Sequence, residues 1–209
     1  MSGIAVKDYD YAHAKAPWWN AYLVPPIMEL ADALGTGNRV LDIGCGNGYI
    51  AGLFAEKGCA VVGIDPSDSG IAQAREAHPD SRFEVDLATP DLRERLGEEP
   101  FDLVVSAEVA EHVYDADEWA LACFNALKPG GQLILTTPYH GYLKNLAICV
   151  MNKWDHHHTS LRAGEHIKFW SRATMSELLT RNGFRVEGFR GAGRMAYLWK
   201  SMVISARRP

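Results

Sequence analysis

Short apolar runs alternate with helical patterns along most of the chain. Runs typical of buried strands lie at residues 39–43, 60–64, 82–85, 101–106 and 132–136. Amphipathic helical patterns separate several of them, at about residues 49–57, 69–77 and 117–127. Because this alternation places helices between consecutive strands, it predicts a mostly parallel sheet with helices on both faces.

The pattern changes at both ends of the chain. Residues 19–34 show helical spacing interrupted by Pro25 and Pro26, which predicts a kink or two helices that cover the fold. Residues 139–164 lack any strand pattern and indicate an inserted cap. A helix that begins after Ser171 and ends near Asn182 and Gly183 precedes strands at 184–189 and 201–207. These two close strands predict an antiparallel edge.

The expected fold is therefore α/β, a Rossmann-like three-layer sandwich around a mostly parallel seven-stranded sheet with one reversed strand. With 209 residues, 47% of them hydrophobic, the chain fits one domain over residues 1–209. Residues 1–36 form its N-terminal cover helices and residues 139–164 form the cap.

Composition narrows the classes of partner. The net charge is −5 without blocks of like charge, which disfavours nucleic acid. No apolar run reaches the ~18 residues of a membrane span, and the N-terminus lacks the pattern of a secretory signal. Four cysteines without a CxxC pair indicate reduced thiols. We expect a cytoplasmic protein that acts on a small molecule, and the sequence leaves its oligomeric state open.

The turn GCGNG follows the first strand of the alternating pattern. Gly44, Gly46 and Gly48 allow a ligand to approach the backbone closely, and Asp65 ends the next strand where a carboxylate can bind ribose hydroxyls. The spacing lacks the last glycine of the dinucleotide fingerprint G-x-G-x-x-G. It favours a nucleoside without a pyrophosphate, such as S-adenosylmethionine, over the alternative of a dinucleotide-dependent oxidoreductase.

The second constellation is SAEVAEHV, after the strand at 101–106. Glu108, Glu111 and His112 would share one face of a helical turn at the carboxyl end of a parallel strand, where ligands bind in such folds. Two carboxylates and an imidazole can bind a metal or move a proton. The alternative is that Glu108 contacts the cofactor and His112 is a buried core residue.

From about Val40 to its C-terminus the chain resembles the class I S-adenosylmethionine-dependent methyltransferase superfamily. The matching segments are DIGCGNG, the acid Asp65, VDLAT and LKPGGQLILTTP. The resemblance implies that Asp42 orients the amino-acid end of the cofactor. The cofactor-binding residues expected on this basis are Asp42, Gly44, Cys45, Gly46, Gly48, Asp65, Pro66, Asp86, Leu87 and Ala107.

The E-x-x-E-H turn resembles that of ubiquinone-pathway O-methyltransferases and of small-RNA 2′-O-methyltransferases, which use it to bind a divalent metal. The small-RNA branch adds a distal histidine, and EHIKFWS resembles its downstream motif, which adds His166. The implied metal ligands are Glu108, Glu111, His112 and His166. This donor set suits Mn²⁺, Fe²⁺, Co²⁺ or Zn²⁺ better than Mg²⁺.

The activity expected from this resemblance is methylation of a small-molecule hydroxyl. His112, His166 and Glu111 are the catalytic candidates, as metal ligands or as a general base with its partner. N-methylation and a catalytically silent nucleoside-binding module stay open as alternatives. The insertion at 139–164 departs from the ubiquinone branch, so a quinone substrate is not carried over. Its run of histidines is either a solvated loop or supplies His157 and His158 as further candidates.

Overall fold

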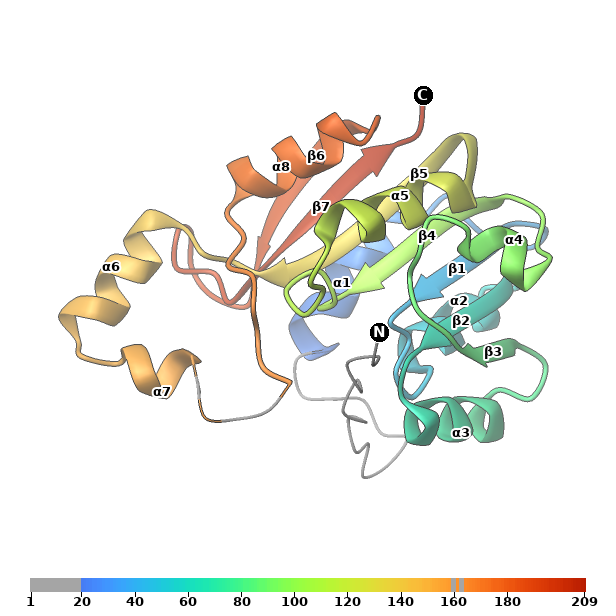
Figure 1. Ribbon diagram of the computed structural model, residues 1–209, viewed down its shortest axis with the longest axis horizontal. Coiled ribbons are helices and arrows are strands. Elements are labelled where there is room, and N and C mark those ends of the chain that lie inside the picture. Colours follow the sequence, from blue (N-terminus) through green and yellow to red (C-terminus); the bar gives the residue numbers. More distant parts are fainter. Residues whose placement is uncertain (1–19, 159–160, 162–163) are drawn as a thin grey trace, which may run out of the picture.

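A seven-stranded sheet organises the part of the chain described by the computed structural model, which is residues 20–158, 161 and 164–209 (Figure 1). Its order is β3-β2-β1-β4-β5-β7-β6. The strands are β1 (Arg39–Ile43), β2 (Ala60–Asp65), β3 (Arg82–Val85), β4 (Phe101–Ala107), β5 (Leu127–Pro138), β6 (Arg185–Ala192) and β7 (Ser201–Arg207). Only β7 runs antiparallel to its neighbours, β5 and β6, within this sheet. The predicted sheet with one reversed strand is confirmed.

Helices cover both faces of the sheet. One face packs against α1 (Asn20–Leu30), α2 (Tyr49–Glu56) and α3 (Asp68–Ala77), and the other against α4 (Leu92–Leu96), α5 (Ala116–Ala126) and α8 (Arg172–Arg181). Neighbouring strand residues alternate between the two cores, as Val40 and Leu41 do. Both are fully buried, and each such side chain contributes about 1.5–3 kcal/mol to folding.

The N-terminal region differs from the expectation in one respect. Helix α1 continues through Pro25 and Pro26 as one helix, so the split into two helices is wrong. Leu23 and Ile27 lie on either side of the prolines and are fully buried, and this packing offsets the backbone hydrogen bonds that proline removes. The part of the predicted cover helices that falls within residues 1–19 lies outside the described residues.

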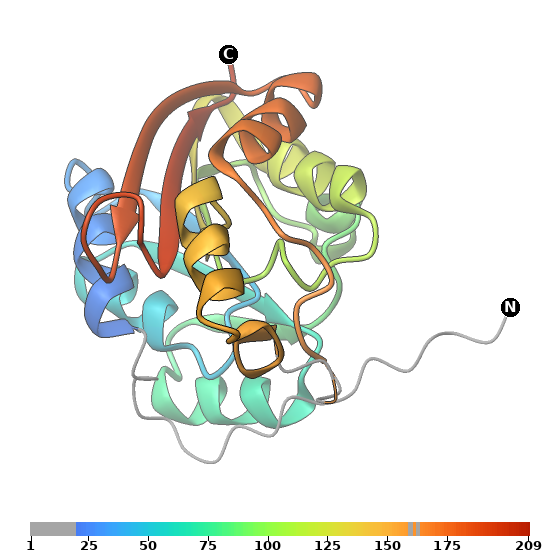
Figure 2. The ribbon, with the colours of Figure 1, turned by 90° about the vertical axis from the view of Figure 1, so that its left-hand side faces the viewer.

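The segment predicted as a cap holds two helices, α6 (Tyr142–Val150) and α7 (Trp154–His158). They lie beyond the carboxyl end of β5 and project from the sheet (Figures 1 and 2). The chain then returns along residues 164–170 to α8. No helix within the described residues is long and apolar enough to cross a membrane.

Candidate active site

The glycine turn lies between β1 and α2, against the turn that follows β4. The amides of Gly44 and Cys45 both donate to the carbonyl oxygen of Ile64, at 2.8 and 2.9 Å. Gly44 has a φ of +78°, and a Cβ there would lie 2.2 Å from a methyl carbon of Val109. A side chain is therefore excluded by conformation and by space, which leaves the backbone open to close approach.

Asp65 ends β2 and holds this turn in place. Its Oδ2 accepts from the amide of Gly46 and its Oδ1 from the amide of Ser67, both at 2.9 Å. A carboxylate offers about four acceptor positions. The structure thus places Asp65 beside the glycines, as the sequence predicted.

Asp42 is the second acid at this end of the sheet. Its side chain is buried, and its Oδ2 has no hydrogen-bond partner within the described part of the chain. Burial, followed by the negative charge of Asp65, raises the pKa of Asp42 to about 7. A buried carboxyl oxygen without a donor is costly, so this position suits a ligand that carries a donor or a positive charge.

The remaining predicted cofactor residues lie at the same edge. Asp86 follows β3 directly, its amide donates to the carbonyl of Asp65 at 3.3 Å, and its carboxylate pairs with Arg95 at 2.7 Å. Leu87 is 51% exposed beside it. Pro66 follows β2 and Ala107 ends β4. The structure therefore gathers these residues at the carboxyl ends of β1 to β4, where open α/β sheets bind ligands.

The turn after β4 is not the helical turn that the spacing suggested. Glu108 has a φ of +56°, and the turn closes through the amide of His112, which donates to the carbonyl of Val109 at 2.9 Å. The Glu108 carboxylate accepts from the hydroxyls of Thr136 at 2.9 Å and Ser201 at 3.3 Å. These contacts, which involve β5 and β7, separate Glu108 from the other candidate ligands.

Glu111 is the buried centre of the second constellation. Its Oε2 accepts from the hydroxyl of Thr137 at 2.9 Å, and its Oε1 has no hydrogen-bond partner among the described residues. Its carbonyl accepts from the amides of Ile167 at 2.9 Å and Lys168 at 3.0 Å. These two backbone bonds bring the segment after the cap against the turn and so deliver His166.

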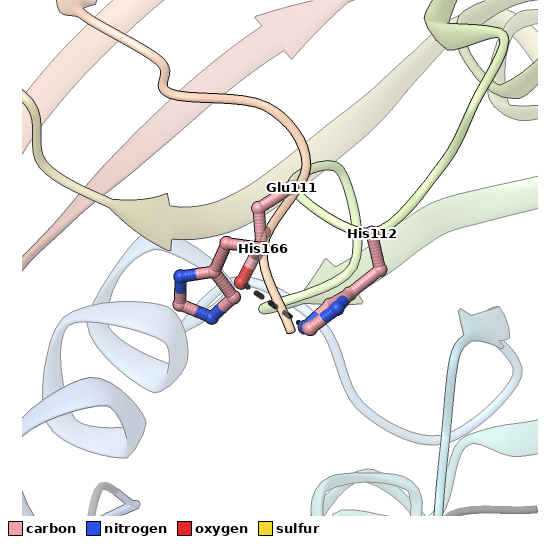
Figure 3. A group of neighbouring side chains, drawn as sticks. All are labelled: Glu111, His112 and His166. Atoms are coloured by element: carbon pink, nitrogen blue, oxygen red, sulfur yellow. Dashed lines mark ion pairs between the residues drawn. The ribbon is translucent and has the colours of Figure 1, made fainter. Parts of the chain in front are cut away.

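Glu111, His112 and His166 converge, as Figure 3 shows. Candidate ligand atoms of the three side chains all lie within 4.8 Å of one another, and Glu108 does not belong to this group. The two imidazole rings meet edge to face with their centres 4.9 Å apart. His112 Nε2 lies 3.9 Å from Glu111 Oε1.

Burial governs the protonation of this group. It raises the pKa of Glu111 well above its ordinary value, and the nearby charge of Glu108 adds to the effect. Burial also lowers the pKa of His166 to about 4, with His112 as the next cause, and lowers the pKa of His112. Both imidazoles are therefore neutral near pH 7, the form that binds metals and accepts protons.

A second set of side chains lies at the cap, and two of its members escaped the sequence analysis. His140 follows β5 and contacts both histidines proposed there, with ring centres 6.2 Å from His157 and 5.7 Å from His158. Lys144 is buried on α6. The position of His140 just after a strand was a usable signal, whereas nothing local marks Lys144 as buried.

Comparison with known proteins identifies the family. The family model described as "Methyltransferase domain" matches residues 13–188. The ubiquinone biosynthesis O-methyltransferase of Bradyrhizobium sp. (strain ORS 278) is 34% identical over 151 residues, which cover 70% of this chain and 56% of that protein. The human mitochondrial ubiquinone biosynthesis O-methyltransferase is 34% identical over 160 residues, 72% of this chain and 42% of its own length. The chain thus spans about half the length of these relatives.

Solved structures agree on the fold. The magnesium protoporphyrin IX methyltransferase of Synechocystis PCC 6803, determined with bound SAH, superposes with a TM-score of 0.66 at 21% identity, over 90% of this chain and 82% of that one. A putative methyltransferase from Bacillus halodurans gives 0.67 at 18% identity, over 89% and 98% of the two chains. The chain belongs to the family of S-adenosylmethionine-dependent methyltransferase domains.

Proposed function

We propose that the protein transfers a methyl group from S-adenosylmethionine to a hydroxyl oxygen of a small molecule. The observation that carries this proposal is the convergence of Glu111, His112 and His166 beside the glycine turn. The O-methyltransferase names of the relatives support oxygen as the nucleophile. Adenosyl binding would use the glycine turn with Asp65, Asp86 and Leu87, and Asp42 would face the amino-acid end.

The chemistry that this site must support is an in-line displacement. The hydroxyl oxygen attacks the methyl carbon, the carbon–sulfur bond breaks, and S-adenosylhomocysteine leaves with the electron pair. The hydroxyl must also lose its proton. A neutral imidazole of His112 or His166 can accept that proton, because burial keeps both rings unprotonated near pH 7. Most of the remaining rate enhancement comes from alignment of the reactants.

The same three side chains also fit a divalent metal. Glu111 Oε1 is buried without a hydrogen-bond partner in the described region, and both imidazoles are neutral near pH 7. One carboxylate and two imidazoles suit Mn²⁺, Fe²⁺, Co²⁺ or Zn²⁺. A bound metal lowers the pKa of a coordinated hydroxyl. Glu108 would join this set only by leaving Thr136 and Ser201.

The test is methyl transfer with and without metal. Purified protein is incubated with S-adenosylmethionine and a panel of catechols, phenols and amines, and methylated products are identified by mass spectrometry. We expect O-methylated catechols, loss of turnover after dialysis against a chelator, and recovery with Mn²⁺ or Co²⁺ rather than Ca²⁺. Glu111→Gln should lose metal measured by elemental analysis and most activity, because one oxygen ligand becomes a neutral amide.

Glu118→Gln is the matched control, since Glu118 is exposed on α5. It should retain wild-type metal content and turnover. Methylation of amines alone would refute the assignment of oxygen as the nucleophile. Full activity of a metal-free enzyme would refute the proposed role of a metal. His112 and His166 would then be left as the candidate bases.

A further inference from the structure

Lys144 is the one lysine or arginine that is buried within the described residues, with 5% of its surface exposed. Its Nζ donates to the carbonyl oxygen of Lys200 at 3.2 Å, and it forms no ion pair with a described carboxylate. An ammonium group has three donors. A buried charge that lacks a counter-ion is strongly unfavourable, so the position suits an anion that the described residues do not supply.

The charged groups around Lys144 do not make up for the missing counter-ion. Burial, followed by the like charge of Arg194, lowers its pKa to about 8, and Glu108 is the single opposing influence. Glu108 itself has a pKa raised to about 7 and is already bonded to two hydroxyls. The other titratable groups that sense Lys144 are the imidazoles of His140, His157, His158 and His166. None of these four can supply a negative charge.

The position of Lys144 separates it from the residues assigned to the cofactor. Helix α6 follows β5, and the hydrogen bond to Lys200 places the ammonium at the start of β7. The candidate cofactor residues lie at the ends of β1 to β4, and β5 separates these strands from β7 in the sheet. An anion beside Lys144 therefore belongs to the methyl acceptor rather than to S-adenosylmethionine.

The neighbouring side chains indicate the size and shape of that acceptor. Aromatic rings of the cap pack together and against the segment that follows it: the rings of His140 and His158 each meet Phe169 with centres 5.0 Å apart, and the ring centres of Trp154 and His158 are 4.2 Å apart. Flat rings of this kind pack well against a flat ligand. One ammonium matches a single negative charge, whereas a phosphate dianion is generally held by several donors.

We propose that Lys144 is a specificity-determining residue that binds a carboxylate on the methyl acceptor, so that the preferred acceptors are hydroxylated aromatic acids. The inference rests on the proposed methylation of a hydroxyl group. It adds that the acid group of the acceptor points to the cap while its hydroxyl group points to Glu111, His112 and His166.

Binding can be measured apart from turnover, so the two proposals can fail separately. Protein saturated with S-adenosylhomocysteine is titrated calorimetrically with 3,4-dihydroxybenzoate and with catechol, which differ only in the carboxylate. We expect the wild type to bind the benzoate at least about tenfold more tightly, the effect of one charged hydrogen bond. Lys144→Met should reduce the ratio of the two affinities to about one. Lys153→Met, at an exposed position in the same cap, should keep the wild-type ratio.

Three results would overturn the proposal: a wild-type ratio near one, an equal loss of both affinities in Lys144→Met, or a lower affinity of that variant for S-adenosylhomocysteine. The wild-type comparison remains decisive if Lys144→Met does not fold. Tight, Lys144-dependent binding of the benzoate without methylation of any acceptor would support the carboxylate site and refute the proposed function.

Discussion

Asp65 shows how one side chain can serve the fold and the ligand together. Its two oxygens accept from the amides of Gly46 and Ser67, so they hold the turn between β1 and α2 in the shape that admits a nucleoside. The same carboxylate type is an acceptor for ribose hydroxyls in folds of this kind. A substitution here therefore removes direct contacts and loosens the turn at once.

We expect Asp65→Ala to weaken binding of S-adenosylhomocysteine by about 1.5–3 kcal/mol, the usual effect of losing hydrogen bonds to a charged group. Isothermal titration measures this effect. Asp80→Ala changes an exposed acid after α3 and should bind like the wild type. Equal affinities for the two variants would contradict the assignment of Asp65.

The positions of site residues were predictable from the sequence where those residues directly follow a strand. Asp65 and the glycines follow apolar runs, and His166 lies where its motif suggested. Glu108 was placed less well because its positive φ and its contacts with Thr136 and Ser201 depend on β5 and β7, which are distant in the sequence. The burial of Lys144 likewise depends on how α6 packs, which no local pattern reveals.

At the scale of elements, the glycine turn and the turn after β4 are in direct contact. Gly44 faces Val109, which lies in the same turn as Glu108, Glu111 and His112. A side chain at position 44 must move Val109 or the turn that carries it. The cofactor turn and the turn that carries Glu111 are thus coupled by packing.

Gly44→Ala should therefore lower turnover as well as stability. Its control is Gly97→Ala, because Gly97 also has a positive φ, of +65°, but has open space around it. That control should lose only the about 1–2 kcal/mol of left-handed strain, measured by urea denaturation, and keep its activity. Gly44→Ala with Val109→Ala should regain part of the activity by relieving the clash. No recovery in this double variant would show that the clash with Val109 is not the cause.

Elements with strong periodicity were predicted within a few residues, because strands buried on both faces and amphipathic helices have distinct patterns. The helices that the sequence predicted less well depend on tertiary contacts. Helix α1 spans two prolines because its apolar side chains are buried. Helices α6 and α7 form in a segment whose mixed composition has no clear period.

At the scale of the whole molecule, buried acids make stability depend on pH. The pKa values of Asp42 and Glu108 are raised to about 7, and that of Glu111 is raised well above its ordinary value. These acids therefore hold more protons in the folded protein than in the unfolded chain between about pH 4 and pH 7. Their contribution to stability is fully present below the ordinary carboxyl pKa and is lost as pH rises through the folded values.

Asp42→Asn should isolate one part of this dependence. The amide has a similar shape and no charge, so the variant should be more stable than the wild type at pH 8, where ionised Asp42 is buried without a described partner for Oδ2. The difference should shrink as pH falls towards 4, because Asp42 is then neutral in the folded wild type as well. Urea denaturation of the ligand-free protein at pH 4.5, 6 and 8 measures the trend.

Asp115→Asn is not a suitable control for this experiment, because Asp115 caps α5 through the amides of Asp117 and Glu118. Asp80→Asn changes an exposed acid and should give a difference that is independent of pH. If Asp42 also faces the ammonium of S-adenosylmethionine, the more stable Asp42→Asn should bind the cofactor more weakly, since a buried carboxylate stabilises a cation that a neutral amide does not. A constant stability difference between Asp42→Asn and the wild type across this pH range would show that Asp42 does not titrate with a raised pKa. Unchanged cofactor affinity of Asp42→Asn would show that the charge of Asp42 does not contribute to cofactor binding.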